Sequence, residues 1–544
     1  MNTASGLNII DFVAIASYLI AIVLIGLLAV RRKTLSGDEY FLAGRSLSWP
    51  VVGSALFASN ISTIHMVGLP ESGYKQGLVI GNFEWMATFT LMLLALVFIP
   101  FYFKSRITTL PEYLEKRYSR ASRTIMAIMA IVAALLIHIG ISLFAGAKVF
   151  QEFFGFNVMT SIAVISAVTA IYTVVGGLTA VVVTETVQTV ILLAGAVLIT
   201  VLAVLALPDV GVNSWADFRN ATKPGQLSML HTSNDEGFAW YAFLLGYPVL
   251  GIWYWCSDQT IVQRALGAKD QLNAQQGALF AGLLKVTPVF FMVFPGVLGY
   301  VLYRDTIGEN ANQTLAVLIK NLVPTGLKGV IAAALLAALM STVASALNSV
   351  GTLMAVDIVK HFRPQTSDRQ QVAIARLTAV VVMLLAMAWS TQGDKFGSIF
   401  EAINKMPAQF LAPPISVVFL WGVFWRRGTK QAAIVTLLLG FAAGFIVFLI
   451  DLPVFGTVAW VTDRERGLGI PFMMQAVYGF LICSVLFVCV SYMTPPPPSE
   501  QIAETTWPEP LQVLRRDPAH GLSDPRVLAG ILLSFMIVLY LTFR

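Results

Sequence analysis

The chain has 544 residues, of which 57% are hydrophobic and only 12% are charged, about half the charged fraction of an ordinary soluble protein. This composition indicates an all-α polytopic membrane protein. It excludes a membrane β-barrel, because the apolar runs are continuous over ~20 residues, whereas barrel strands alternate over ~10. The net charge of +6 does not indicate nucleic-acid binding, since the basic residues stand at the ends of apolar runs.

Hydropathy predicts about fourteen transmembrane helices. We interpret the first as a retained helix rather than a signal peptide, because its basic residues follow it and no convincing cleavage site is present. The apolar runs fall near residues 9–30, 50–70, 79–103, 123–150, 157–176, 181–206, 238–262, 274–303, 329–356, 372–390, 398–424, 431–451, 470–493 and 526–543.

Basic residues are unequally divided between the two sides of the predicted membrane. With both termini outside, 22 of the 35 Lys and Arg residues fall inside, 10 fall outside and 3 lie within spans. Because cytoplasmic segments carry an excess of Lys and Arg, this division favours a multi-pass protein of the cell (inner, cytoplasmic) membrane with both termini outside.

The second apolar run contains a polar interruption. An apolar stretch ends at Ala58, the residues from Ser59 to His65 are mostly polar, and apolar character resumes at Met66. Such an interruption is costly in hydrocarbon unless it lines a cavity, so we predict a broken helix facing a site at mid-membrane. The alternative is a helix end followed by an ordinary loop.

A second interruption is expected in the run 238–262, where Gly246, Pro248 and Gly251 precede the aromatic triplet 253–255. It lies five spans after the first. Two broken helices in corresponding positions of two halves point to an inverted repeat with a binding site between them.

Glu84, Glu185 and Lys285 are ionisable residues in or beside apolar spans. Each would cost about 2.5–3.5 kcal/mol at a helix centre, which is tolerated when the group is paired or faces water. Glu84 and Lys285 have opposite charges and could pair, directly or through a polar ligand. The alternatives are an interfacial position for Glu84 and snorkelling of Lys285 to the inside.

Hydrogen-bonding side chains near indole and phenol rings suit a sugar or polyol. Hydroxyls need donors and acceptors, and the apolar face of a sugar ring needs an aromatic surface. The alternative for the aromatic residues is a belt at the bilayer surface. The residues concerned are Asn60, His65, Glu84, Tyr254, Trp255 and Lys285.

The run 337–345 is small and hydroxylated, and Ser341, Thr342 and Ser345 can share one helix face. With carbonyls freed by a broken helix they would form an all-oxygen site for a monovalent cation, since calcium prefers several carboxylates. The alternative is close packing of helices through small residues. No ATP-binding P-loop, metal-ligand spacing or catalytic grouping is visible, so ion-gradient coupling remains and no enzyme activity is expected.

Short motifs follow one another in order between about Ile10 and Gly440. They are Tyr40-Phe-Leu-Ala-Gly-Arg-Ser46, Leu56-Phe-Ala-Ser-Asn-Ile61, His65, Gly81-Asn-Phe-Glu-Trp85, Leu110-Pro-Glu-Tyr-Leu114, Tyr172-Thr-Val-Val-Gly-Gly-Leu178, Trp253-Tyr-Trp-Cys-Ser-Asp-Gln259 with Val262-Gln-Arg264, and Pro413-Pro-Ile-Ser-Val-Val-Phe-Leu-Trp-Gly-Val-Phe-Trp425. In these motifs the chain resembles the solute:sodium symporters, and within them the sodium/glucose cotransporters.

The resemblance implies a leucine-transporter-like core of two inverted five-helix repeats and sodium-coupled uptake by alternating access. We therefore expect a first helix and cytoplasmic linker at 1–49, the first repeat at 50–206, an extracellular loop at 207–237 and the second repeat at 238–428. Three additional helices would occupy 429–544, with a cytoplasmic Pro-rich linker at 494–525.

The resemblance also implies roles for single residues. Glu185 stands at a carboxylate position linked to sodium coupling, and Asn404 matches a sugar-binding glutamine only with a one-residue insertion before Pro413, beside Lys405. The implied sodium ligands are Ala58, Ile61, Ala338, Ser341 and Thr342. The implied sugar contacts are Asn60, His65, Glu84, Tyr254, Trp255, Lys285 and Asn404, and the implied gate residues are Leu69, Phe83 and Phe400.

We therefore predict a sodium-driven symporter that imports a glucose- or galactose-like hexose. The alternatives are myo-inositol or another polyol as substrate, or a solute sensor with a transporter fold. Ala344 stands where relatives that use two sodium ions carry threonine, so one ion per sugar is expected. The expected partners are the sugar, sodium and the lipid bilayer; no nucleic acid and no obligate protein partner is indicated.

Overall fold

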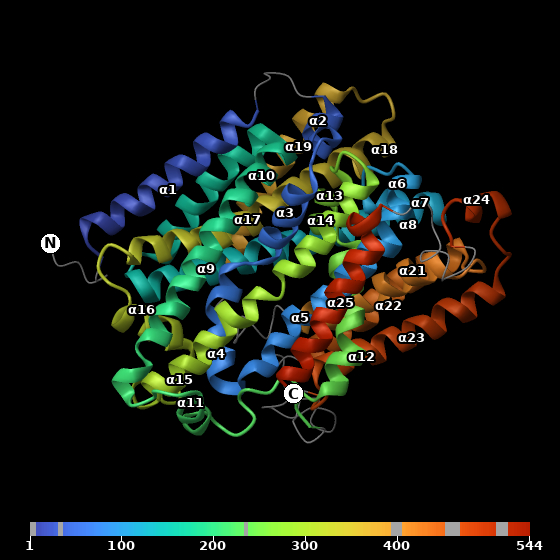
Figure 1. Ribbon diagram of the computed structural model, residues 1–544. Coiled ribbons are helices and arrows are strands. Elements are labelled where there is room, and N and C mark those ends of the chain that lie inside the picture. Colours follow the sequence, from blue (N-terminus) through green and yellow to red (C-terminus); the bar gives the residue numbers. More distant parts are fainter. Residues whose placement is uncertain (1–6, 31–35, 233–237, 393–404, 452–467, 508–519) are drawn as a thin grey trace.

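The computed structural model is almost entirely helical (Figure 1). It describes residues 7–30, 36–232, 238–392, 405–451, 468–507 and 520–544. Eleven helical segments within these ranges are long and apolar enough to cross a membrane, or up to twelve if the bent pair α3 (Trp49–Asn60) and α4 (Thr63–Gln76) is one span. The predicted all-α polytopic class is therefore confirmed.

The eleven segments are made of α-helices, several of them joined by π-helical turns. They comprise α1 (Ile9–Leu28); the 3-10 turn η2 (Leu78–Gly81), α5 (Asn82–Leu93), η3 (Leu94–Phe98) and α6 (Ile99–Lys104); α8 (Arg120–Ala133), η4 (Ala134–Ile141) and α9 (Ser142–Phe154); α10 (Val158–Leu205) with the 3-10 turn η5 (Leu207–Val210); α14 (Gln271–Leu284), η7 (Val289–Val293) and α15 (Phe294–Ile307); α17 (Lys328–Thr352), η9 (Leu353–Val359) and α18 (Lys360–Phe362); α19 (Asp368–Ser390); η11 (Pro407–Leu411) and α21 (Ala412–Phe424); α22 (Lys430–Asp451); α23 (Phe472–Met493); and α25 (Pro525–Thr542).

Shorter helices lie between and beside these segments. They include α2 (Gly37–Leu42), α7 (Leu110–Arg117), α11 (Trp215–Ala221), α12 (Trp240–Gly251), η6 (Ile252–Ser257), α13 (Gln259–Leu266), α16 (Thr314–Leu322) and α24 (Ser499–Ala503). Outside the helices, the described backbone forms two isolated β-bridges, Leu47 with Ala268 and His231 with Ala239.

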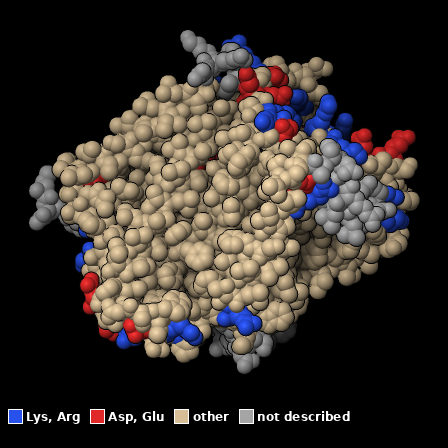
Figure 2. Space-filling view, viewed as in Figure 1, with Lys and Arg blue, Asp and Glu red and all other residues tan. Residues whose placement is uncertain are grey.

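The bundle is organised around α17. This helix is almost completely buried and packs extensively on α10. In Figure 1, α3, α14 and α17 lie between α1 at one edge and α22 with α23 at the other. Figure 2 shows charged side chains gathered at two ends of the molecule, with a broad uncharged band between them, as expected for a chain whose middle faces lipid.

The break predicted in the second apolar run is confirmed. The axes of α3 and α4 differ by 64°. Ile61 has an extended backbone (φ −75°, ψ 111°), and Ser62 is the N-cap of α4. The Ser62 amide donates to Nδ1 of His65 at 3.2 Å. The polar residues of this stretch therefore cap the second half-helix, as a helix start inside a membrane requires.

The second break lies within the predicted run 238–262, but it is not at the glycines. α12 passes through Gly246, Pro248 and Gly251, and the helix is interrupted only at Asp258 (φ −81°, ψ 124°). The two glycines serve close packing instead. A Cβ on Gly246 would lie 2.5 Å from the Met473 carbonyl oxygen, and one on Gly251 would lie 2.4 Å from Cγ2 of Thr90.

One long element contains a third interruption. α10 has 48 residues, but Gly177 within it has φ +57° and ψ −150°, a conformation that favours glycine. A straight helix of this length would measure ~72 Å, more than twice the ~30 Å of bilayer hydrocarbon. Gly177 therefore divides α10 close to the point where the sequence predicts one span to end and the next to begin.

Candidate functional site

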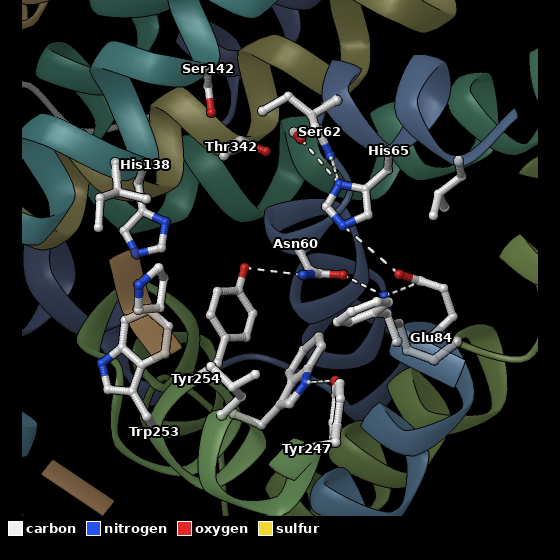
Figure 3. Close-up of a pocket in the computed structure, with 18 residues that line it drawn as sticks. Asn60, Ser62, His65, Glu84, His138, Ser142, Tyr247, Trp253, Tyr254 and Thr342 are labelled. Atoms are coloured by element: carbon white, nitrogen blue, oxygen red, sulfur yellow. Dashed lines mark hydrogen bonds and ion pairs between the residues drawn. The ribbon is translucent and has the colours of Figure 1, made fainter. Parts of the chain in front are cut away.

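A cavity of about 170 Å³ lies where the broken segments meet. Its walls come from the break between α3 and α4, from α5, from the η4–α9 and α12–η6 segments, and from Lys285, α17 and η11. Figure 3 shows the lining side chains. They are Asn60, Ser62, Ile64, His65, Leu69, Phe83, Glu84, Ile137, His138, Ser142, Tyr247, Leu250, Trp253, Tyr254, Trp255, Lys285, Thr342 and Pro407.

A hydrogen-bonded network joins the predicted sugar contacts (Figure 3). The Lys285 ammonium pairs with the Glu84 carboxylate and donates to Oδ1 of Asn60 at 2.5 Å. Nδ2 of Asn60 donates in turn to the Tyr254 hydroxyl at 3.1 Å. Nε2 of His65 lies 3.8 Å from the Glu84 carboxylate. Because an uncompensated buried charge is strongly destabilising, the ion pair accounts for the burial of both Lys285 and Glu84.

Aromatic rings pack against one side of this network. The Tyr254 and Trp255 rings meet edge to face with centroids 5.1 Å apart. The Lys285 ammonium lies 5.6 Å from the centre of the Trp255 ring, within cation–π range. The indole N–H of Trp255 donates to the Tyr247 hydroxyl at 3.4 Å. The cavity therefore combines paired polar groups with apolar ring faces.

Two of the predicted gate residues, Leu69 and Phe83, also line this cavity. The Phe83 ring stacks on Phe472 of α23 with centroids 5.9 Å apart. The third, Phe400, and the predicted sugar contact Asn404 lie outside the described residues. The neighbouring Lys405 ammonium lies 3.4 Å from the Asp451 carboxylate of α22.

All five predicted sodium ligands converge between the end of α3 and the middle of α17. The Ser341 hydroxyl lies 2.9 Å from the Ala58 carbonyl oxygen and 3.0 Å from that of Ala338. The Thr342 hydroxyl lies 3.4 Å from the Ile61 carbonyl oxygen and 3.2 Å from that of Ala338. Carbonyls at a helix C-terminus lack intrahelical donors, so those of Ala58 and Ile61 are free to take other partners. The set offers oxygen atoms only, which suits a hard cation.

Glu185 lies next to this oxygen cluster and is fully buried. Its carboxylate accepts hydrogen bonds from the Ser59 hydroxyl at 2.9 Å and from Ser345, and it pairs with the Arg264 guanidinium at 2.9 Å. Ser59 follows Ala58 directly in the chain. The predicted coupling carboxylate of Glu185 is therefore linked to the predicted sodium ligand Ala58 through Ser59.

Sequence reasoning missed several of these residues. Arg264 is one of the 22 basic residues that the charge division places inside, and the structure shows it as a buried partner of Glu185. His138 lines the cavity although it stands alone in an apolar run. An ionisable residue inside a span is a functional candidate by default, and this signal was available for His138. Tyr247 and Ser142 carry no distinguishing pattern, and Trp253 belongs to the aromatic triplet but was not among the predicted contacts.

A model of the sodium:solute symporter family matches residues 40–440 of this chain. The chain is 33% identical over 548 residues to the sodium/myo-inositol cotransporter of Homo sapiens, an alignment that covers 92% of this chain and 76% of that protein. The chain belongs to the sodium:solute symporter family. The resemblance found in the sequence motifs is thereby confirmed.

Other comparisons agree with this assignment. The chain is 31% identical over 545 residues to sodium/glucose cotransporter 4 of Mus musculus, covering 93% of this chain and 78% of that protein. Its fold is similar to that of a Na⁺-coupled sialic acid symporter in a substrate-bound outward-open state, with a TM-score of 0.76, 22% identity, and coverage of 90% of this chain and 99% of the other. The family membership makes this chain a multi-pass sodium-coupled transporter rather than an enzyme, with sodium and a small solute as its substrates.

The Glu185–Arg264 pair predicts a strong effect on stability. Arg264→Gln should destabilise the protein by about 3–5 kcal/mol, because it leaves a buried carboxylate unpaired. Combining it with Glu185→Gln should recover part of that loss. Apparent melting temperatures in detergent measure both. Lys75→Gln, which removes an exposed i,i+4 pair with Glu71, is the control and should change stability by less than about 0.5 kcal/mol. Additive losses in the double variant would contradict the pairing.

Proposed function

We propose that this protein imports a glucose- or galactose-like hexose together with sodium by alternating access. One observation carries the proposal: the hydrogen-bonding side chains of Asn60, His65, Glu84 and Lys285 line one cavity together with the rings of Tyr254 and Trp255. Charged and neutral hydrogen-bonding groups can pair with hydroxyls, and ring faces can cover the apolar side of a sugar. Glu84 already supplies a negative charge, which disfavours a carboxylate substrate.

A second candidate substrate is myo-inositol or a related polyol. A ring of hydroxyls makes the same demands on the cavity as a hexose. This candidate is favoured by the 33% identity to a protein named sodium/myo-inositol cotransporter.

Uptake into proteoliposomes tests the function. Labelled glucose, galactose, mannose and myo-inositol would be supplied with and without an inward sodium gradient. We expect the gradient to drive accumulation of at least one of them, and the order of rates to distinguish a hexose from a polyol. Equal uptake in the two conditions for every solute would overturn the proposal.

We propose that the fold has fourteen spans and that residues 50–206 and 238–428 form two inverted five-helix repeats. The breaks at Ile61 and Asp258 support the repeats, because each lies in the first span of its repeat. The interruption at Gly177, which would divide α10 into two spans, and the α12–α13 segment, which would form another, support a total of fourteen spans. Helix 1–49, loop 207–237 and the region 429–544 would lie outside the repeats. The excess of Lys and Arg on one side supports placement in the cell membrane with both termini outside.

Sodium coupling would arise at the oxygen cluster. Ala58 and Ile61 belong to the broken first helix of one repeat, and Ala338, Ser341 and Thr342 belong to α17 in the other repeat. An ion held by both elements stabilises the arrangement in which they are close. Because a ligand shifts an equilibrium only by its difference in affinity for the two states, sodium binding here would select one conformation of the cavity.

We expect Ser341→Ala and Thr342→Ala each to raise the sodium concentration for half-maximal uptake by roughly tenfold, since a polar contact with a charge contributes about 1.5–3 kcal/mol. Initial uptake rates at a series of sodium concentrations measure this. Ser349→Ala, at a buried position further along α17, is the matched control. Full uptake driven by a pH gradient in sodium-free buffer would count against sodium coupling at this site.

Glu84→Gln preserves the shape of the side chain but removes its charge. Solute binding should weaken by about 1.5–3 kcal/mol, as expected for loss of a hydrogen bond to a charged group. Isothermal titration in saturating sodium measures the affinity, and Glu71→Gln at the protein surface serves as the control. An unchanged affinity in the folded Glu84→Gln protein would remove Glu84 from the binding site.

One sodium ion should move with each solute molecule. A second site would need another set of oxygens, and Ala344 offers no hydroxyl beside Ser345. Each sodium ion that moves down ~100 mV contributes about 2.3 kcal/mol, so the stoichiometry sets the limit of accumulation. The reversal potential of solute-coupled current in vesicles measures the ratio. A slope that corresponds to two ions per solute would refute the prediction.

A further inference from the structure

The cavity has a second polar wall that the network around Glu84 does not use. His138 of η4, Ser142 of α9 and Thr342 of α17 contribute to it. In Figure 3, His138 lies on the opposite side of the cavity from Glu84, with Tyr254 between them. Glu84 and His138 therefore give the cavity polar groups at two separate places.

The position of the His138 ring is fixed from two directions. Its Nε2 lies 3.2 Å from Oδ2 of Asp258. Its face is nearly parallel to that of Trp253, at 13° with centroids 6.4 Å apart. Asp258 is itself held in place, because its Oδ1 accepts a hydrogen bond from the Thr260 amide at 2.6 Å. An oriented imidazole in a cavity wall is typical of a group that presents one nitrogen to a ligand.

The Asp258 contact determines which nitrogen is available. An ionised carboxylate only accepts hydrogen bonds, so Nε2 of His138 carries a proton and donates it. In the neutral ring, Nδ1 then has a free lone pair. Among the residues that the structure describes, none forms a hydrogen bond with this nitrogen.

We propose that His138, oriented by Asp258, is a substrate-binding residue whose Nδ1 accepts a hydrogen bond from a solute hydroxyl distant from Glu84 and Lys285. The proposal rests on the function proposed above and narrows the substrate class. Hydroxyls are required at both ends of the ring. A carboxylate at the His138 end is disfavoured, because it would face a lone pair backed by the Asp258 charge.

The alternative is that the His138–Asp258 contact only joins η4 to the helix break. A deoxy-sugar scan separates the two roles, because a structural role affects all analogues equally. The probes are labelled glucose, galactose and myo-inositol, and the monodeoxy derivatives of whichever the wild-type protein transports. The readout is the apparent affinity in sodium-driven uptake by the full-length protein.

We expect His138→Phe to lower the affinity for the parent solute roughly tenfold, as for the loss of one hydrogen bond. One monodeoxy analogue and the parent solute should then bind the His138→Phe variant with equal affinity. The wild-type protein should bind the parent solute more tightly than that analogue. His138→Gln, which keeps an acceptor, should restore part of the affinity. For the Glu84→Gln variant, the monodeoxy analogue that binds as well as the parent solute should be one that lacks a different hydroxyl.

Asp258→Asn tests the positioning role of the carboxylate. Asparagine preserves the N-cap of α13, but its amide can donate to Nε2 and so place the ring proton on Nδ1. Because a hydroxyl can accept from Nδ1–H as well as donate to Nδ1, we expect this variant to keep a penalty for the same deoxy analogue and to lose less affinity than His138→Phe, with an unchanged half-saturating sodium concentration.

Equal deoxy penalties in wild type and His138→Phe, in folded protein with normal sodium dependence, would overturn the proposal and leave the proposed function intact. A wild-type protein that transports none of the probes would instead overturn the proposed function, and this proposal with it.

Discussion

The break between Ile61 and Ser62 is the constraint on which the site depends. In a membrane interior an unpaired backbone group costs several kcal/mol, so a helix can be interrupted only where partners are supplied. Here the His65 ring accepts from the Ser62 amide, and hydroxyls of α17 donate to the carbonyls of Ala58 and Ile61. The carbonyls and hydroxyls that satisfy the α3 end of the break are therefore the same oxygens that we propose as sodium ligands. In this segment, the same oxygen atoms both complete the hydrogen bonding of the broken backbone and form the proposed ion site.

Two buried ion pairs flank the break, and they differ in what surrounds them. Glu185 is surrounded by Ser59, Ser345 and Arg264, all fully or almost fully buried. Glu84 and Lys285 also form a pair, but their partners line a cavity. A hydroxylated solute can exchange hydrogen bonds with the second pair without leaving a charge unpaired. The first pair offers no such exchange and is suited to hold elements together. We therefore propose that the Glu84–Lys285 pair contacts the solute and that the Glu185–Arg264 pair holds helices together.

The sequence predicted the fold class, the first break and the hydroxyl face of α17, because each leaves a local signal, whereas the positions of Ala58, Ile61 and Ala338 were implied by the family resemblance. Polar residues within an apolar run indicate a break, and hydroxyls at helical spacing indicate a shared face. Arg264 could not be recognised in this way, since an arginine at a span end has the same pattern whether it faces water or a buried carboxylate. The sequence analysis placed the second break at Gly246 and Gly251, because a glycine in a sequence can indicate either a helix break or close packing of helices. Only the structure shows that these two glycines pack against Met473 and Thr90.

π-helical turns explain why several side chains line the cavity although the α-helical period of the sequence did not predict it. Ile137 and His138 lie in η4, residues 253–255 lie in η6, and Pro407 lies in η11, and all six line the cavity. On an ordinary α-helix three successive side chains point in widely different directions, so a triplet such as 253–255 would not share one wall. A wider turn changes those directions, and such turns are frequent at functional sites. It also brings Asp258, at the end of η6, within reach of His138 in η4. The positions of Ile137, His138, Pro407 and residues 253–255 in the cavity wall therefore could not be derived from an α-helical period alone.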